Sequence, residues 1–127
     1  MTTPADRKYT TEHVWVQTEK DVVTLGVTNY AQEQLTDIVF VELPDIGRRV
    51  KAGESIAVVE STKSTSDVYA PVTGSVVAVN EELVNHPEKV NESPYEEGWI
   101  VKLKAPSVDV SKMMDAAAYD AFAAKQS

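Results

Sequence analysis

Residues 53–76 contain two apolar runs separated by a short polar stretch, with a lysine, Lys63, at its centre. Apolar and β-branched runs bounded by turn residues are typical of β-strands. The pattern therefore predicts a β-hairpin whose polar tip carries Lys63. The side chains expected to stiffen it by burial are Ile56, Val58, Val68 and Val72. A lysine at such a tip is exposed, has small neighbours and is accessible to a modifying enzyme.

Further strand-like runs predict a mainly β protein. Residues 22–27, 38–43, 75–79 and 98–103 are rich in β-branched and aromatic residues. Between the first two runs, Thr28 is expected to cap a short helix in which Ala31 and Leu35 share one face. The polar segment 80–98, with two prolines, is expected to form a long excursion from the sheets.

Near the C-terminus the sequence predicts a final helix over residues 116–124. Asp115 is expected to be its N-cap, with Ala118 and Phe122 on one face. Trp15 and Trp99 are expected to lie in the core, because large aromatic side chains dominate cores.

A Pro-x-x-Gly motif occurs twice, at Pro44 and Pro71, on either side of Lys63. Two such units are too few for a solenoid. They favour a compact sandwich with approximate two-fold symmetry, although a chance match in a β-rich sequence is the alternative interpretation.

Composition excludes several classes of protein. At 127 residues the chain is expected to be one domain, 1–127. It has no cysteine, so it has no disulfide, thiol nucleophile or cysteine metal site. Its net charge of −8 without a basic cluster in the sequence argues against nucleic acid binding. It contains no apolar run long enough for a membrane helix and no secretory signal.

Five segments, in order, resemble the H-protein family of the glycine cleavage system, a relative of lipoyl and biotinyl carrier domains. They lie at 9–16, 26–32, 39–44, 59–71 and 90–99, and include the motifs Glu60-Ser61-Thr62-Lys63 and Val90-Asn91-x-x-Pro94-Tyr95. The resemblance implies a barrel-sandwich hybrid of two small β-sheets with quasi-two-fold symmetry. Short helices and a C-terminal helical segment at about 108–124 accompany the sheets.

The resemblance also implies that lipoic acid is joined to Lys63 through an amide, which takes the net charge from −8 to −9. No catalytic or metal-binding residue is implied. Biotin is the alternative prosthetic group, but biotin carriers flank their lysine with methionine, whereas this chain has Thr62 and Ser64.

The implied function is to carry the aminomethyl group of glycine from glycine decarboxylase, a pyridoxal-phosphate enzyme, to aminomethyltransferase, which uses tetrahydrofolate. Dihydrolipoyl dehydrogenase, with FAD and NAD, would close the disulfide again, and a lipoate ligase or lipoyltransferase would attach the cofactor. The alternatives are a lipoyl relay protein for other lipoate-dependent complexes and an unmodified β-rich scaffold. We expect a monomer in the bacterial cytoplasm, or in the mitochondrial matrix if a transit peptide has been removed.

Four further residues are implied to serve the site. Glu60 is expected to be recognised by the lipoylating enzyme. Asp67, with Gln34 and Glu12, is expected to line the cleft that receives the arm. A plain exposed carboxylate at position 60 and a turn cap at position 67 are the structural alternatives. Val14 and Gln34 depart from the family pattern, in which an acidic residue and a histidine are common.

Overall fold

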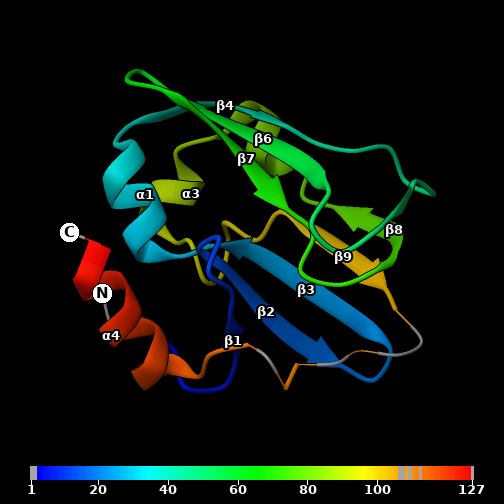
Figure 1. Ribbon diagram of the computed structural model, residues 1–127. Coiled ribbons are helices and arrows are strands. Elements are labelled where there is room, and N and C mark those ends of the chain that lie inside the picture. Colours follow the sequence, from blue (N-terminus) through cyan, green and yellow to red (C-terminus); the bar gives the residue numbers. More distant parts are fainter. Residues whose placement is uncertain (1–2, 106–107, 109, 112, 127) are drawn as a thin grey trace.

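Two antiparallel sheets face each other in the computed structural model, which describes residues 3–105, 108, 110–111 and 113–126 (Figure 1). The larger sheet joins, in spatial order, β1 (Lys8–Tyr9), β2 (Val14–Glu19), β3 (Val22–Val27), β9 (Val101–Lys104), β8 (Gly74–Val79) and β5 (Arg49–Val50). The smaller sheet joins β4 (Ile38–Glu42), β6 (Ser55–Ser61) and β7 (Thr65–Tyr69). The helices are α1 (Asn29–Leu35), α2 (Glu82–Asn85), α3 (Lys89–Glu92) and α4 (Ala116–Gln126).

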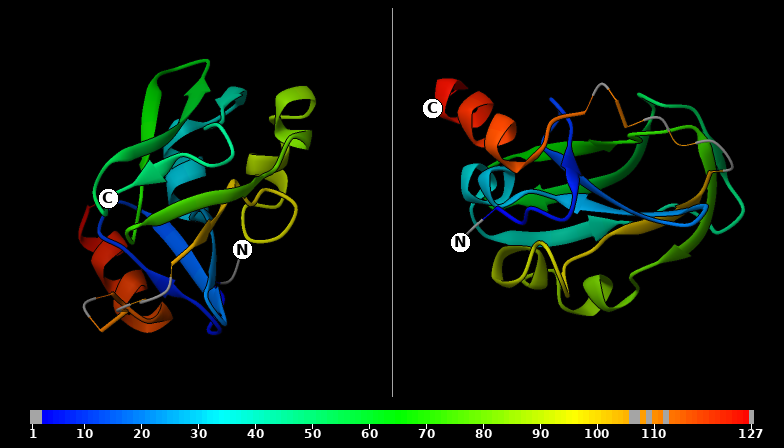
Figure 2. Two further views of the ribbon diagram at one scale, coloured as in Figure 1. Left: turned by 90° about the vertical axis from the view of Figure 1, so that its right-hand side faces the viewer. Right: turned by 90° about the horizontal axis from the view of Figure 1, so that it is seen from below.

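The space between the sheets is filled by aliphatic side chains from both. Leu25 and Leu103 of the larger sheet and Ile56, Val59 and Val68 of the smaller one belong to one buried cluster. Burying each such side chain contributes roughly 1.5–3 kcal/mol. The predicted mainly β sandwich with short helices and a C-terminal helix is therefore confirmed, and Figure 2 shows its layers from two further directions.

The predicted hairpin forms from β6 and β7, and its tip projects beyond the body of the sandwich (Figures 1 and 2). Three of the four side chains expected to stiffen it are buried, but Val58 is only half-buried. The pairing register shifts between Ser55 and Ala57. Such a bulge lets Ile56 and Ala57 both face the core, and Val58 then turns outward.

The sequence did not predict the first two strands or the helices within the excursion. Strand β1 has only two residues, and β2 pairs along its whole length with β3. Helices α2 and α3 have four residues each and are anchored by one fully buried side chain apiece, Leu83 and Val90. Single anchors in a polar segment leave no helical repeat to detect.

Asp115 caps α4 as predicted, because its Oδ1 accepts a hydrogen bond of 2.8 Å from the backbone N–H of Ala118. The predicted face of this helix is wrong, since Tyr119 and Ala123 are the buried residues. Tyr119 stacks on Tyr9 with ring centroids 5.0 Å apart, and this contact sets the rotation of the helix. The expected helical segment at about 108–124 includes positions 109 and 112, which lie outside the described residues.

A buried arginine, Arg7, holds the aromatic cluster next to α4. Its guanidinium lies 4.7 Å from the ring centroid of Trp15 and donates to the carbonyl oxygen of Tyr95 at 2.5 Å. Another guanidinium nitrogen of Arg7, Nη2, donates to the carboxylate of Glu96 at 3.2 Å. Trp15 is buried as expected, whereas Trp99 is half-buried against the same cluster. None of the described helices is long and apolar enough to cross a membrane.

Replacing Arg7 with alanine is expected to lower the free energy of unfolding by about 3 kcal/mol, because the carbonyl of Tyr95 loses its donor and the stacking on Trp15 is lost. Urea denaturation monitored by tryptophan fluorescence measures the change. Arg49→Ala, at an exposed position, is the matched control and should change stability by less than about 0.5 kcal/mol. Equal effects of the two substitutions would contradict this role for Arg7.

Candidate functional site

The hairpin tip is shaped by one serine, Ser61. Its hydroxyl accepts hydrogen bonds from the backbone N–H groups of Lys63 at 3.1 Å and Ser64 at 2.9 Å. Its backbone N–H donates to the carbonyl of Ser64 at 2.8 Å. The backbone N–H groups of Ser61, Lys63 and Ser64 are therefore bonded within the turn, and the side chain of Lys63 is left exposed above it.

The tip is docked against the C-terminal end of α1. The Nζ of Lys63 donates to the carbonyl oxygen of Gln34 at 3.2 Å, and the backbone N–H of Thr62 donates to the carbonyl of Asp37 at 3.1 Å. The last carbonyls of a helix have no partner within it, and they attract cations. Lys63 is thus held where α1 ends and the hairpin begins to turn.

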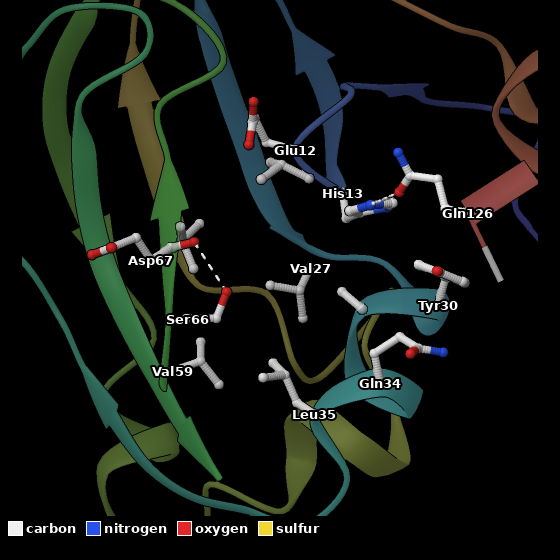
Figure 3. Close-up of a pocket in the computed structure, with 13 residues that line it drawn as sticks. Glu12, His13, Val27, Tyr30, Gln34, Leu35, Val59, Ser66, Asp67 and Gln126 are labelled. Carbon is white, nitrogen blue, oxygen red and sulfur yellow. Dashed lines mark hydrogen bonds between the residues drawn. The ribbon is translucent and has the colours of Figure 1, made fainter. Parts of the chain in front are cut away.

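A cleft of about 520 Å³ opens beside this contact, between α1, the hairpin and the start of β2 (Figure 3). Its apolar lining consists of Val14, Val27, Ala31, Leu35, Val59 and Val68. Its more polar lining consists of Glu12, His13, Tyr30, Gln34, Ser66, Asp67 and Gln126. Because Gln34 both lines the cleft and binds Nζ, a group attached to Lys63 would start at the rim.

Three of the four predicted accessory residues, Glu12, Gln34 and Asp67, line this cleft, whereas Glu60 does not. Glu60 is half-buried on β6, opposite Phe40 and Thr65. Asp67 lies at the edge of the cleft, but its carboxylate points away from it in Figure 3 and accepts a hydrogen bond of 2.8 Å from the hydroxyl of Ser55. The peptide and not the carboxylate of Asp67 is therefore turned toward the cleft.

Val14 gives the cleft an apolar wall. Its side chain is 1% exposed and packs in the main core. A carboxylate at this depth would lose its hydration without a cationic partner, which is costly. Val14 and Gln34 therefore both contribute to the cleft, and both are uncharged.

A chain of hydrogen bonds fixes the side of the cleft formed by α1 and α4. Thr28 is fully buried, and its Oγ1 caps α1 by accepting a hydrogen bond of 3.2 Å from the N–H of Ala31. The same Oγ1 lies 2.7 Å from the hydroxyl oxygen of Tyr119. Nδ1 of His13 lies 2.6 Å from the same hydroxyl, and Nε2 lies 2.9 Å from Oε1 of Gln126. Since Oε1 can only accept, Nε2 of His13 is the donor to Gln126.

Sequence reasoning predicted the cap at Thr28 but missed His13 and Gln126 as cleft residues. The capping contact is local, spanning three residues. His13 and Gln126 are 113 residues apart, and no spacing within the sequence signals their contact.

A second hollow of about 590 Å³ lies at the base of the hairpin and contains none of the predicted site residues. Arg49, Lys51 and Lys104 gather there. This basic group was not evident from the sequence, because Lys104 comes from a segment more than 50 residues away from Arg49 and Lys51.

Burial raises the pKa of the Tyr119 phenol to about 12. It also raises the pKa values of Tyr9 and Tyr95 above their ordinary value. In each case the main cause is that the low-polarity surroundings disfavour the phenolate.

Stability should therefore fall in alkaline solution. Below pH 10, the ordinary tyrosine value, the contribution of Tyr119 is complete, and it is lost as pH rises toward 12 because the unfolded chain ionises first. For one tyrosine, the free energy of unfolding should fall by about 1.4 kcal/mol per pH unit in this range.

Tyr119→Phe should make this fall less steep, and it should lower the free energy of unfolding by about 1–3 kcal/mol at pH 7. Denaturant titrations between pH 7 and 12 measure both, with Phe122→Leu as control; an unchanged slope in Tyr119→Phe would refute the assignment.

Comparison with known proteins gives consistent matches over almost the whole chain. The family model described as Glycine cleavage H-protein matches residues 7–126. A glycine cleavage system H protein from Deinococcus radiodurans is 55% identical over 120 residues, covering 94% of this chain and 96% of that protein. One from Anaeromyxobacter sp. is 48% identical over 127 residues, covering 99% of each. The crystal structure of such a protein from Mycobacterium marinum superposes with a TM-score of 0.86 at 38% identity, covering 93% of this chain and 96% of that one.

Proposed function

Because this chain belongs to the glycine cleavage H-protein family, we propose that Lys63 is the residue to which lipoic acid is joined through an amide. The chain is a lipoyl carrier of the glycine cleavage system. The observation that supports Lys63 is its place at an ordered hairpin tip, exposed, with Nζ at the rim of a cleft.

The residues around Lys63 fit an acylated lysine. An amide nitrogen keeps one N–H, which can still donate to the carbonyl of Gln34. The positive charge is lost, but at an exposed position this costs little. Thr62 and Ser64 are small and exposed, so they leave room for a modifying enzyme.

The cleft fits the arm. Its volume of about 520 Å³ is within the range of roughly 300–1,000 Å³ typical of ligand sites. Val27, Leu35 and Val59 offer apolar contact to a hydrocarbon chain and a sulfur ring. When attached, lipoic acid supplies a disulfide that accepts the aminomethyl group of glycine and is closed again after transfer. The apolar side chains would keep water from that group, a known function of closed sites.

The chain's own contribution is positioning. Side chains buried on the inner face of the hairpin, such as Val59 and Val68, hold it rigid, while the lysine stem above the tip is flexible. A tethered group stays near a docked partner at high effective concentration. We infer that the chain itself changes no bond, and that the cofactor and the partner enzymes carry the chemistry.

We propose the same partners that the sequence predicts: glycine decarboxylase, aminomethyltransferase, dihydrolipoyl dehydrogenase and a lipoate ligase or lipoyltransferase. Glu12 and Gln34 are proposed to contact the arm from the rim of the cleft, and Asp67 through its peptide. Glu60, on the outside of the hairpin, is proposed to face the lipoylating enzyme.

Intact-mass measurement tests the attachment site. The protein is incubated with a lipoate ligase, ATP and lipoate, alongside Lys63→Arg and the matched control Lys51→Arg, whose lysine is also exposed. We expect the wild type and Lys51→Arg to gain one lipoyl group and Lys63→Arg to gain none. If Lys63→Arg gained a lipoyl group, another lysine would be the attachment site.

Filling the cleft tests its protective role. Ala31→Trp places a bulky ring in the cleft from α1, whereas Ala117→Trp places one on the exposed face of α4. Both variants should be lipoylated at the wild-type rate. We expect the aminomethyl group to be lost from the carrier several-fold faster in Ala31→Trp alone, as followed by mass spectrometry after loading by glycine decarboxylase. Equal lifetimes in all three proteins would show that the cleft does not shelter this group.

A further inference from the structure

Strand β4 exposes two apolar side chains in succession, which a regular strand with one buried face does not do. Val39 is 53% exposed and Phe40 is 45% exposed, whereas Ile38 and Val41 are buried. The register between β4 and β6 shifts between Ile38 and Phe40. This bulge breaks the alternation and turns both side chains outward, and bulges are often found beside functional sites.

These two side chains lie close to the proposed attachment site. Phe40 pairs with Glu60 near the end of β6. Lys63 lies three residues further on, in the turn, and three residues span at most about 10 Å at about 3.3 Å per residue. The segment that leads into β4 is bonded directly to the tip, since the carbonyl of Asp37 accepts from Thr62. The apolar pair and the lysine therefore belong to one continuous surface.

Carboxylates border this apolar pair. Asp37 and Glu42 are exposed and Glu60 is half-buried. None of the three forms an ion pair with another residue in the described part of the chain. The surface thus combines an apolar centre with a border of three carboxylates, and Arg48 lines the same hollow as one of them, Glu42.

We propose that Val39 and Phe40 form the centre of the surface on which the enzyme that acylates Lys63 docks, and that this enzyme presents an apolar pocket bordered by lysine or arginine. The inference rests on the proposed function. Interface centres are depleted of charged residues and enriched in aromatic ones. The tip itself offers only serine and threonine side chains around Lys63, so the nearest exposed aromatic surface is Phe40.

The size of an ordinary protein interface supports the docking of the acylating enzyme on this surface. An enzyme that acylates Lys63 must take Nζ into its active site, so its contact surface includes the tip. A standard interface covers about 800 Å² on each partner, equivalent to a disc of roughly 16 Å radius. Such a disc centred near Lys63 includes a patch about 10 Å away.

The reaction served by this surface balances with an acyl adenylate as donor. The lysine ammonium loses one proton, and its nitrogen forms a bond to the acyl carbon. The bond from that carbon to the phosphate oxygen breaks, and AMP leaves with the electron pair. A second proton leaves the nitrogen, which gives a neutral amide.

The test is the kcat/KM for acylation by a lipoate ligase with ATP and lipoate, followed by intact mass. We expect Val39→Ser/Phe40→Ser to lower kcat/KM about tenfold, mainly through KM. Phe40→Leu should stay within about twofold of wild type. Ile46→Ser removes an apolar side chain that is 64% exposed in the loop between β4 and β5, at the other end of β4 from the tip, and should have no effect (Figure 1). Unfolding temperatures of all variants show whether they fold; if the double variant does not, the two single serine variants replace it.

Ionic strength probes the charged border. Raising the salt concentration from about 50 to 300 mM should lower the wild-type kcat/KM, and Glu60→Gln should weaken that dependence. Equal kcat/KM for wild type and folded Val39→Ser/Phe40→Ser would overturn the docking surface and leave Lys63 as the attachment site. Slower loading by glycine decarboxylase with unchanged acylation would also overturn it, since the patch would then serve another partner. Absence of acylation in the wild type would overturn the proposed function as well.

Discussion

The buried hydrogen bond between Thr28 and Tyr119 is the contact on which the arrangement of the site depends. Thr28 follows directly after β3 of the larger sheet and is the N-cap of α1, and its hydroxyl contacts Tyr119 of α4, near the other end of the chain. The direction of α1 determines where the carbonyls of Gln34 and Asp37 lie, and these carbonyls hold the hairpin tip. The buried hydroxyl of Thr28, with both of its hydrogen bonds made, thus fixes the helix against which Lys63 is held. Unpaired buried polar groups cost about 1–3 kcal/mol each, so this contact specifies the position of α4 as well as stabilising it.

The site divides its mechanical roles between a rigid base and a flexible extension. Val59 and Val68 are among the most deeply buried residues of the hairpin, whereas every side chain from Thr62 to Thr65 is exposed. The cleft beside the tip combines aliphatic side chains from the core with a polar rim from α1 and the turn before β2. A carrier needs both features, because an arm must reach several partners and yet shelter its cargo between them. We propose that the outer face of the same hairpin, next to the bulge of β4, receives the enzyme that acylates Lys63.

Local patterns in the sequence predicted the hairpin, most of the core strands and the caps at Thr28 and Asp115, since each depends on residues a few positions apart. The resemblance to a family predicted three residues that the fold brings to the cleft, Glu12, Gln34 and Asp67. The buried Arg7 was not predictable, because its partner Tyr95 lies 88 residues away and an arginine is usually a surface residue. The face of α4 was predicted wrongly for a related reason: the helix is alanine-rich on several sides, and only the tertiary contact between Tyr119 and Tyr9 selects one. The orientation of the Asp67 carboxylate likewise depends on Ser55, across the hairpin.

We propose that an arm attached to Lys63 enters the cleft between α1 and the hairpin. The most direct measurement is an NMR experiment on the carrier with a ¹³C-labelled lipoyl group and labelled valine and leucine methyl groups, after loading with glycine and glycine decarboxylase. We expect nuclear Overhauser contacts between the arm and the methyl groups of Val27, Leu35 and Val59, and none to the exposed Val77 on β8. An arm that shows no contact with the cleft methyl groups in the loaded state would contradict it.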